Sequence, residues 1–528
     1  MNRTYALVWN PSLGAWSVAN EHARRRGKGA GAVLAAILLL PALASAADLP
    51  TGGQVSAGQG QIGLPANNQM VIDQASNKLA IDWQSFDIAA GNKVTFNQPG
   101  RDAIALNRVL GADGSKIMGQ LDANGRVFIV NPNGVLFGQG AQVNVGGLVA
   151  STLDISNSDF EAGNYAFKGN GKNAAVVNNG KITAADGGSV ALLGGTVSNN
   201  GVIVANQGSV ALAAGNAVTL DFAGDGLLNV QVDEAVVDAL VENHQLIKAD
   251  GGQVLLTANA GEALINTVVN NTGTIEAQTV GEKNGKIVLL GSFDGGSVQV
   301  AGTLDASAPN GGNGGFIETS GAHVNVADSA KVTTTAAQGK TGKWLIDPND
   351  FTIADSGGNM SSTAVAAAIA SNDFEIQTAT MGSAGGNGDI HVNSAVRLTG
   401  NNTLTLTAER NININASITV EGTSGGLALN YGGNNGNSST TPAADTRYTA
   451  NAPVNLTGDN ARLSINGNAY SVIRSMADLL AIDSIGLGGR YALALDLDAS
   501  GAIYTSALVG KTAAFTGHFA GLGHTISD

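Results

Sequence analysis

Residues 178–212 read NNGKITAADGGSVALLGGTVSNNGVIVANQGSVAL, and this stretch repeats itself. Ser-Val-Ala-Leu begins at Ser189 and again at Ser209, 20 residues later, while Asn-Asn-Gly begins at Asn178 and again at Asn199, 21 residues later. A period near twenty residues is typical of one coil of a solenoid. Aliphatic residues also alternate with small polar ones, which is the two-residue period of a β-strand. The stretch therefore predicts coils built from short strands.

The same alternation continues along most of the chain. It recurs at Val143–Val145, Val298–Val300, Val324–Val326, Leu404–Thr407 and Ile412–Ile414. In such a solenoid each strand pairs in parallel with the coils above and below, so aliphatic side chains stack inward and Gly or Asn occupies corners that need positive φ. At a strand spacing near 4.8 Å, we expect about 20 coils and a rod approaching about 100 Å.

Three segments are predicted to leave the coil as short helices, residues 233–243, 361–370 and 475–482. In the first segment, four aliphatic residues recur at helical spacing. In the third, Ser475 is placed to cap the helix, with Asp478 at the third position. The fold class expected from these patterns is all-β, with short helical excursions.

Composition limits both the core and the partners. The chain contains 73 glycines, and only 5% of its residues are aromatic, so its core must be built from Val, Ile, Leu and Ala. Its net charge is −14 with no long acidic or basic run, which argues against a surface that binds nucleic acid. The absence of cysteine excludes disulfides and thiolate metal sites. It also suits passage through an oxidising compartment.

The first 46 residues read as an export leader. Basic residues lie between Arg24 and Lys28, residues 30–40 are apolar, and Ala44-Ser45-Ala46 is a typical cleavage sequence, so we expect cleavage between Ala46 and Ala47. The apolar stretch is too short to span a bilayer. The segment ahead of it, which includes Leu7-Val8-Trp9-Asn10, resembles the extended signal peptide region of very large exported bacterial proteins.

Several ordered phrases between Val94 and Thr152 carry a second resemblance. They are Val94–Pro99, Leu106–Val109, Ile117–Gly119, Gly125–Gly138 and Val145–Thr152. Over about residues 48–165 the chain resembles the two-partner secretion, or haemagglutination activity, domain of filamentous haemagglutinin-type exoproteins. The resemblance implies a right-handed parallel β-helix. It also implies recognition by a dedicated outer-membrane β-barrel transporter, after export by the inner-membrane secretion machinery and signal peptidase.

The family's phrases single out candidate secretion determinants. Carried over from the resemblance, they are Asn107, Arg108, Asn131, Pro132, Asn133 and Gly134. Asn-Pro followed by Asn-Gly fixes one φ and permits a positive φ afterwards, which suits a corner between strands. Whether these residues contact the transporter or only shape the coil stays open. A second family phrase, Asn-Pro-Asn-Leu, is absent, and Asn97-Gln98-Pro99 lies near its expected place, which puts the chain outside the subclass that has it.

Two further phrases lie beyond residue 340. Trp344–Phe351 resembles a phrase of large haemagglutinin-like exoproteins, and Phe515–Ile526 resembles the glycine-rich GLUG repeat. Because the chain stops within that unit, we expect a fragment of a longer protein. The expected domains are an extended signal peptide (1–46), the secretion domain (47–165), β-helix repeats (166–430), a polar linker (431–451) and a C-terminal β region (452–528).

No pattern points to catalysis, a cofactor or a metal. The six histidines lack metal-ligand spacing. Gly385–Ile390 is a single imperfect copy of a calcium-binding repeat, and such a site needs stacked neighbours. Asp347 and Asp350 could form a carboxylate pair of the kind that carbohydrate enzymes use, but the phrase around them favours a structural junction.

We therefore expect a non-enzymatic adhesin that is secreted or displayed on the surface of a Gram-negative-type bacterium, with an unknown receptor on host cells or other bacteria. The N-terminal domain would be its secretion signal and β-helix nucleus. One alternative is the stalk of a contact-dependent growth-inhibition toxin whose toxic domain lies elsewhere. A β-helical polysaccharide hydrolase is a third hypothesis.

Overall fold

The computed structural model describes residues 6–10, 15–19, 48–170, 173–222, 227–259, 268–433, 435–436, 445–511 and 513–528. The chain divides into two compact units, Met1–Ala46 and Ala47–Asp528. In the first unit, β1 (Ala6–Asn10) pairs antiparallel with β2 (Ala15–Ala19). The expected cleavage site at Ala46 and Ala47 lies outside the described residues. No helix within the described ranges is long and apolar enough to cross a membrane.

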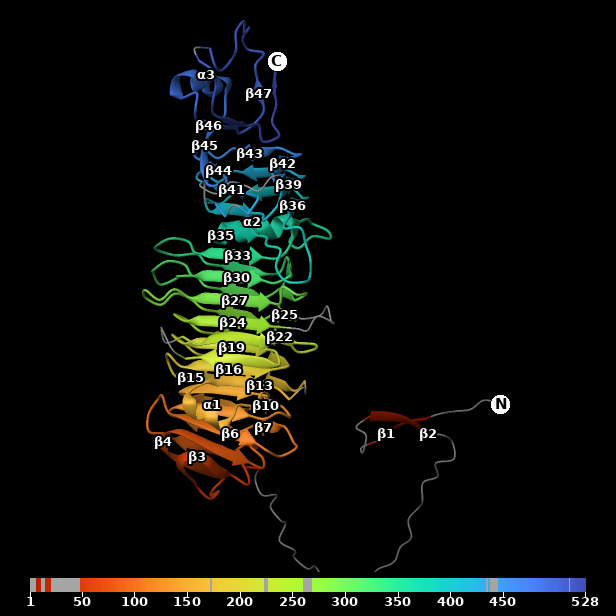
Figure 1. Ribbon diagram of the computed structural model, residues 1–528. Helices are drawn as coiled ribbons and strands as arrows, with labels where there is room; N and C mark the ends of the chain where they lie inside the picture. The colour runs from red at the N-terminus through yellow and green to blue at the C-terminus, as the bar shows by residue number, and fades with distance from the viewer. Residues whose placement is uncertain are drawn as a thin grey trace, which may run out of the picture. The chain divides into compact units, whose positions relative to one another are not determined.

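The second unit is a parallel β-helix whose coils are stacked one on another (Figure 1). Each regular coil contributes one strand to each of three faces, which we call A, B and C in chain order. Face A is one parallel ladder of 14 strands among the described residues: β4 (Gln69–Trp83), β6 (Ile104–Val109), β9 (Arg126–Val130), β12 (Gly147–Ser151), β16 (Ser189–Gly194), β19 (Ser209–Ala214), β24 (Gln253–Ala258), β27 (Lys286–Gly291), β30 (Phe316–Ser320), β33 (Lys343–Asp347), β35 (Asp373–Gln377), β38 (Thr403–Thr407), β41 (Gly426–Asn430) and β44 (Arg462–Ile465).

Faces B and C consist of shorter strands. Face B contains β7 (Ser115–Ile117), β10 (Val135–Phe137), β14 (Ala175–Asn178), β17 (Thr196–Asn199), β22 (Leu240–Asn243), β25 (Val268–Asn271), β28 (Ser297–Val300) and β31 (His323–Val326), followed by β34 (Phe351–Ile353), β36 (Ile390–Val392), β39 (Ile412–Ile414) and β42 (Tyr448–Ala450). Face C contains β5 (Lys93–Asn97), β8 (Gln120–Ala123), β11 (Gln142–Val145), β15 (Lys181–Ala184), β18 (Val202–Val204), β23 (Leu246–Lys248), β26 (Thr274–Glu276), β29 (Thr303–Asp305) and β32 (Lys331–Thr333), followed by β37 (Val396–Leu398), β40 (Ile418–Val420) and β43 (Val454–Leu456).

The residues that the predicted repeat aligns do pair in the structure, but most coils are longer than the predicted period of about twenty residues. Ser189 pairs with Ser209, and Asn178 pairs with Asn199. The next coil is longer, since Ser209 pairs with Gln253, 44 residues on. The expectation of about 20 coils was therefore wrong, because loops and an added sheet lengthen the turns. The 14 strands of face A span roughly 60 Å at a spacing of about 4.8 Å.

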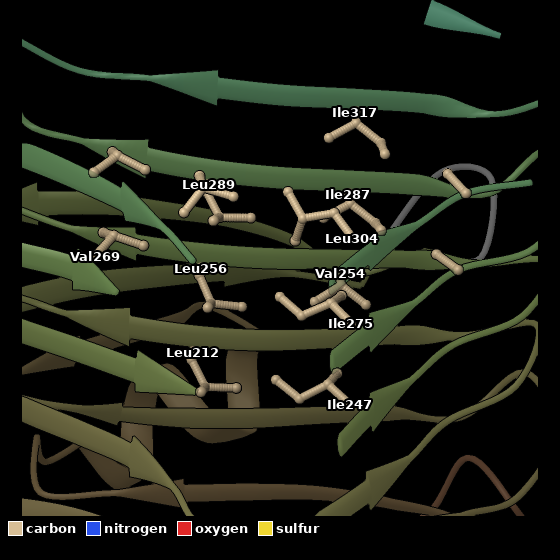
Figure 2. Packing of buried hydrophobic residues seen from close by; sticks show 14 of the residues in the cluster. Leu212, Ile247, Val254, Leu256, Val269, Ile275, Ile287, Leu289, Leu304 and Ile317 are labelled. Carbon is tan, nitrogen blue, oxygen red and sulfur yellow. The ribbon is translucent and has the colours of Figure 1, made fainter. Parts of the chain in front are cut away.

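The core lies inside the coils and is built as columns of aliphatic side chains. Leu212, Leu256 and Leu289 pair in register on face A, and Ile247, Ile275 and Leu304 do so on face C (Figure 2). All six are fully buried. Burying a side chain of this size stabilises the fold by about 1.5–3 kcal/mol. The columns explain why the sequence needs few aromatic residues.

A ladder of four asparagines closes one corner of this core. Asn178, Asn199, Asn243 and Asn271 have no exposed surface. Each side-chain amide of the first three donates to the side-chain oxygen of the next at 2.8 Å. Buried amide groups must be paired, and a stack of identical amides pairs them at the strand spacing.

Antiparallel strands lie at both ends of the face A ladder. β3 (Gln54–Ile62) pairs with β4. At the other end β45 (Asn468–Ile473) turns back on β44, and beyond it β46 (Arg490–Leu493) pairs in parallel with β48 (His518–Ala520), and β47 (Leu497–Asp498) with β49 (Ile526–Ser527). The GLUG-like phrase thus contributes two short strands to the C-terminal part.

Two of the three predicted helices are confirmed. The helices are α1 (Asn157–Ala162), α2 (Ser362–Ser371) and α3 (Met476–Ile485). Ser361 and Ser475 cap the last two, and the cap at Ser475 was predicted. The helix predicted over residues 233–243 was wrong, because this segment includes the end of β21 (Asn229–Glu234) and the whole of β22. In β22 Val241 and Asn243 point inward at strand spacing.

The polar stretch 431–451, which was expected to be a linker, lies partly outside the described residues. Its last residues form β42, which pairs in parallel with β39. At least this end of the stretch belongs to the coil.

Only face A is continuous through residues 321–372. Face B is not paired between β31 and β34, while on face C α2 takes the place of a strand and packs against β32 and β37. Face A continues from β30 to β33 and β35, where the rings of Trp344 and Phe374 lie 4.8 Å apart between centroids. The haemagglutinin-like phrase Trp344–Phe351 supplies most of β33 and the first residue of β34 in this junction.

Candidate functional site

The candidate secretion determinants lie beside a second hydrophobic cluster, on the outside of face A. There α1 and an antiparallel sheet of β13 (Tyr165–Lys168), β20 (Ala217–Asp221) and β21 pack over the early face A strands. Leu106, Phe128 and Val149 point into this cluster and are almost completely buried. The strands from β6 to β19 are therefore buried on both sides.

Asn107 points the other way, into the coil. It has no exposed surface. Its side-chain oxygen accepts a hydrogen bond from Trp83 Nε1 at 3.0 Å, and its amide nitrogen donates to the carbonyls of Ala105 at 3.2 Å and Phe128 at 3.3 Å. Every polar atom of the side chain is thus paired, which is the condition for burying an amide at low cost. Asn107 fixes the indole of Trp83 inside the first coils.

Arg108 points outward and joins the coil to the segment before α1. Its side chain is 12% exposed. Nη1 donates to Asp82 Oδ1 at 3.0 Å and to Asn157 Oδ1 at 2.9 Å, and Nε donates to Asp154 Oδ1 at 2.9 Å. Nη2 donates to the Ile155 carbonyl. Charge-assisted bonds of this kind are the stronger class of hydrogen bond, so one guanidinium on β6 holds both β4 and residues 154–157 in place.

The Asn-Pro-Asn-Gly turn connects β9 to β10. Asn131 has no exposed surface, and its amide donates to Asp113 O and Ser115 Oγ, both at 3.0 Å. Its side-chain oxygen accepts from the Asn133 backbone amide at 3.0 Å, which closes an Asx turn around Pro132. Gly134 has φ of 118°, a conformation that glycine adopts readily. The local geometry predicted from the sequence is present.

The two groups of determinants meet in space. Arg108 pairs with Val130, the residue before the turn, and Asn133 Nδ2 donates to the Gly111 carbonyl at 3.0 Å. The turn is thus tied to the loop that follows β6. In the folded chain the side chains of Asn107, Arg108 and Asn131 all form hydrogen bonds with partners within the protein.

Two further residues of this region were missed in the sequence. Lys78 Nζ donates to the carbonyls of Phe160 and Glu161, both at 2.8 Å, at the C-terminal end of α1, and burial lowers its pKa. Gln98 accepts from the Gly125 amide at 2.8 Å and donates to Gln74 Oε1 at 3.0 Å. Neither residue belongs to a motif with a fixed spacing. The only sequence signal for Gln98 was that Asn97-Gln98-Pro99 lies near the expected place of the absent family phrase Asn-Pro-Asn-Leu.

The other chemical candidates do not assemble into one site. Burial, followed by Glu318 and Glu375, raises the pKa of Asp347 to about 6. Asp350 instead accepts backbone N–H groups of Asn387 and Asp389, at 3.0 Å and 2.8 Å. The two carboxylates thus have different neighbours, and among the residues that the structure describes no hydrogen bond joins them into a pair. In the described part of the chain, no group of three or more His, Asp or Glu residues could hold a metal ion.

The fold and these contacts define a β-helical protein whose N-terminal coils are reinforced by added elements. The chain belongs to the two-partner secretion exoproteins. Residues 46–306 match the TPS secretion domain, and residues 1–47 match the Extended Signal Peptide of Type V secretion system. The matched secretion domain extends past residue 165, where the sequence analysis placed its end. The resemblances of the leader and of the N-terminal domain are thereby confirmed.

Similar proteins agree with this assignment. Heme/hemopexin-binding protein of Haemophilus influenzae is 38% identical over 271 residues, which cover 47% of this chain and 29% of that protein. Its counterpart in strain Rd is 36% identical over 260 residues, 47% of this chain and 28% of that protein. The chain thus spans less than a third of these relatives.

A solved structure agrees with the fold. The crystal structure of the HMW1 secretion domain from Haemophilus influenzae matches with a TM-score of 0.55 and 24% identity, over 79% of this chain and all of that chain. The predicted β-helix is thereby confirmed.

Membership of this family fixes the route of export. The extended signal peptide and the secretion domain indicate a Gram-negative protein that crosses the periplasm and is secreted or exposed at the surface. A TPS secretion domain implies an outer-membrane transporter as partner.

Proposed function

We propose that this chain is a filamentous haemagglutinin-like adhesin, with residues 46–306 as its secretion signal and folding nucleus and the later coils as a rod that presents binding surface. One observation carries the proposal: face A continues without a break from β4 to β44, well beyond the matched secretion domain. From β27 on, its strands mostly alternate buried and partly exposed residues, so apolar groups fill the inside and polar groups cover much of the outside.

The early coils support the nucleus role. Around Phe128 their strands are buried on both sides, and Arg108 ties them to neighbouring segments. These features stabilise a first coil, which has no preceding coil to stack on. A parallel β-helix grows by pairing each new strand with an existing one, so a stable first template favours folding as the chain emerges.

Secretion and adhesion are tested separately. In cells that carry the transporter, Asn131→Ala or Asn133→Ala should abolish release into the medium, while Asn144→Ala, an exposed asparagine of β11, should not. Release of all three variants at the wild-type level would contradict the assigned role of the turn.

For adhesion, bacteria lacking the gene should adhere less to epithelial cells or to other bacteria than the complemented strain. A chain ending after residue 306 should be secreted but should not restore adherence. Equal adherence of the deleted and complemented strains would contradict the adhesin proposal.

The alternative of a toxin stalk makes a different prediction. A stalk would inhibit neighbouring cells that lack an immunity protein, which competition between marked strains measures. We also propose that the chain is not an enzyme. Turnover of polysaccharide by the purified protein, lost in Asp347→Asn, would contradict this.

A further inference from the structure

An open groove of about 520 Å³ lies where the β-helix changes its strand direction. β44 is the last strand of the face A ladder, and β45 turns back antiparallel on it, close to β41 (Figure 1). The groove is lined by the edge of these strands and by residues that precede β44 and follow β45. Its position is outside the matched secretion domain.

Two arginines in this groove are without acidic partners. Arg462 Nη2 donates to the Ser424 carbonyl at 3.1 Å and more weakly to Thr403 Oγ1 at 3.4 Å, and Arg474 Nη2 donates to the Gly458 carbonyl at 2.6 Å. Among the described residues, neither guanidinium forms an ion pair.

One nitrogen of Arg474 is shielded from solvent and unpaired. Its Nε has almost no accessible surface and no hydrogen-bond partner in the described structure. Leaving a charged donor unpaired in this way is costly, and an anion bound beside the same guanidinium would offset part of that cost through its opposite charge. A carboxylate suits a guanidinium because its two oxygens can accept two parallel N–H bonds.

The rest of the lining is mixed. Asp459, Asn460 and Ser464 supply groups that bind hydroxyls, and Leu427, Leu463 and Val472 supply apolar surface. Tyr470 is also part of the lining, and burial raises the pKa of its phenol, which stays a neutral donor. Sugar rings combine an apolar face with a rim of hydroxyls, and a half-buried tyrosine offers them both an apolar body and a polar tip.

We propose that this groove binds an acidic sugar, with the carboxylate on Arg462 and Arg474 and the hydroxyls on Asp459 and its neighbours. The single carboxylate of Asp459 favours a ligand with one negative charge per ring over a phosphate, which it would repel more strongly. The inference rests on the proposed adhesin function, for which it names a site and a class of ligand.

Calorimetric titration of the exported chain tests the site, with a galacturonate trimer as probe and a galactose trimer as its uncharged control. The acidic trimer should bind at least about tenfold more tightly, since charge-assisted bonds exceed neutral ones in strength. Arg462→Gln should weaken it by about tenfold. Arg397→Gln is the matched control: this side chain is 71% exposed, pairs with Glu421 and lies on face C, so binding should not change.

Asp459→Asn provides a readout that a structural role would not produce. Removing this repelling charge should raise the affinity for the acidic trimer several-fold relative to that for the neutral trimer, because only the acidic trimer is repelled by Asp459. Equal binding of both trimers, no binding of the acidic trimer by folded wild-type protein, or equal losses in Arg462→Gln and Arg397→Gln would each overturn the proposal. Circular dichroism verifies that every variant is folded.

The outcome is separable from that of the adhesin proposal. If cells adhere through the protein but the folded chain does not bind the acidic trimer, only the sugar site is wrong. If the trimer binds with the predicted charge dependence but deletion of the gene leaves adherence unchanged, the adhesin function is wrong while the groove still binds its ligand.

Discussion

The coils from β6 to β19 and those from β27 to β41 share one parallel ladder but differ in what covers their outer side. In β12 and β19 every residue is buried, while in β27 and β33 buried residues alternate with accessible ones. α1 and the sheet of β13, β20 and β21 account for the difference. Strands covered on both faces read as continuous apolar runs, and strands with one wet face alternate. We therefore expect the outer layer, in addition to the ladder, to determine how stable a coil is.

Phe128→Ala should produce the largest difference between the two regions. Phe128 lies on the outer side of β9, 1% exposed, with the rings of Tyr165, Phe167 and Phe222 within 6.2 Å between centroids. Removing a buried phenyl ring costs about 3–5 kcal/mol. Leu345→Ala, on the outer side of β33, should cost about 1 kcal/mol, because this side is partly solvated. Urea unfolding measures both, and equal losses would refute the comparison.

Arg108→Gln should have the next largest effect. It removes the charge that Asp82 and Asp154 share and loosens the segment before α1, so we expect a loss of about 2 kcal/mol. Arg397→Gln, an exposed arginine that pairs with Glu421, should lose no more than about 0.5 kcal/mol. Hydrogen exchange should also show faster opening of α1 in Arg108→Gln alone. Unchanged exchange there would mean that the outer layer does not depend on this contact.

Asn199→Ala tests the asparagine ladder, which begins in the first of these regions and ends at Asn271, before β27. The substitution leaves the amide of Asn178 and the side-chain oxygen of Asn243 without their ladder partners, and we expect a loss of about 1–3 kcal/mol. The surface change Asn144→Ala should leave unfolding nearly unaffected. If the two variants unfold alike, the buried ladder does not stabilise the coils.

Asp347→Asn should give the smallest effect and one that depends on pH. Burial and the neighbouring Glu318 and Glu375 raise the pKa of Asp347 from 3.8 to about 6. The folded chain therefore holds this proton more tightly than the unfolded chain, so its contribution to stability falls as pH rises from about 4 to about 6. After allowance for solvent screening, Asp347→Asn should stabilise the protein by about 1 kcal/mol at pH 7 and flatten this slope. A steeper slope in the variant would contradict the assignment.

Much of the fold and of the site could be predicted because the signals are local. Alternation predicted the strands, the repeat from Ser189 to Ser209 predicted one register, and the cap at Ser475 predicted the start of α3. The turn at Asn131 is local too, and its geometry was predicted. The helix prediction for residues 233–243 was wrong because the four aliphatic residues there are compatible with a helix as well as with strands. The parallel pairing of β22 with β17, which is a contact between distant residues, decides for the strand.

By itself, then, the sequence determined export, the solenoid and the family. Only the tertiary structure decided the length of the coils, the outer layer and the surroundings of Arg108. The physical reason is the sequence separation of the contacts involved. A two-residue period and a cap depend on neighbours in the chain, whereas Arg108 reaches Asp154, 46 residues away, and β13 pairs with β20 because both cover the same apolar surface around Phe128. Contacts at that separation are set by the stacking of coils, and no short stretch of sequence records them.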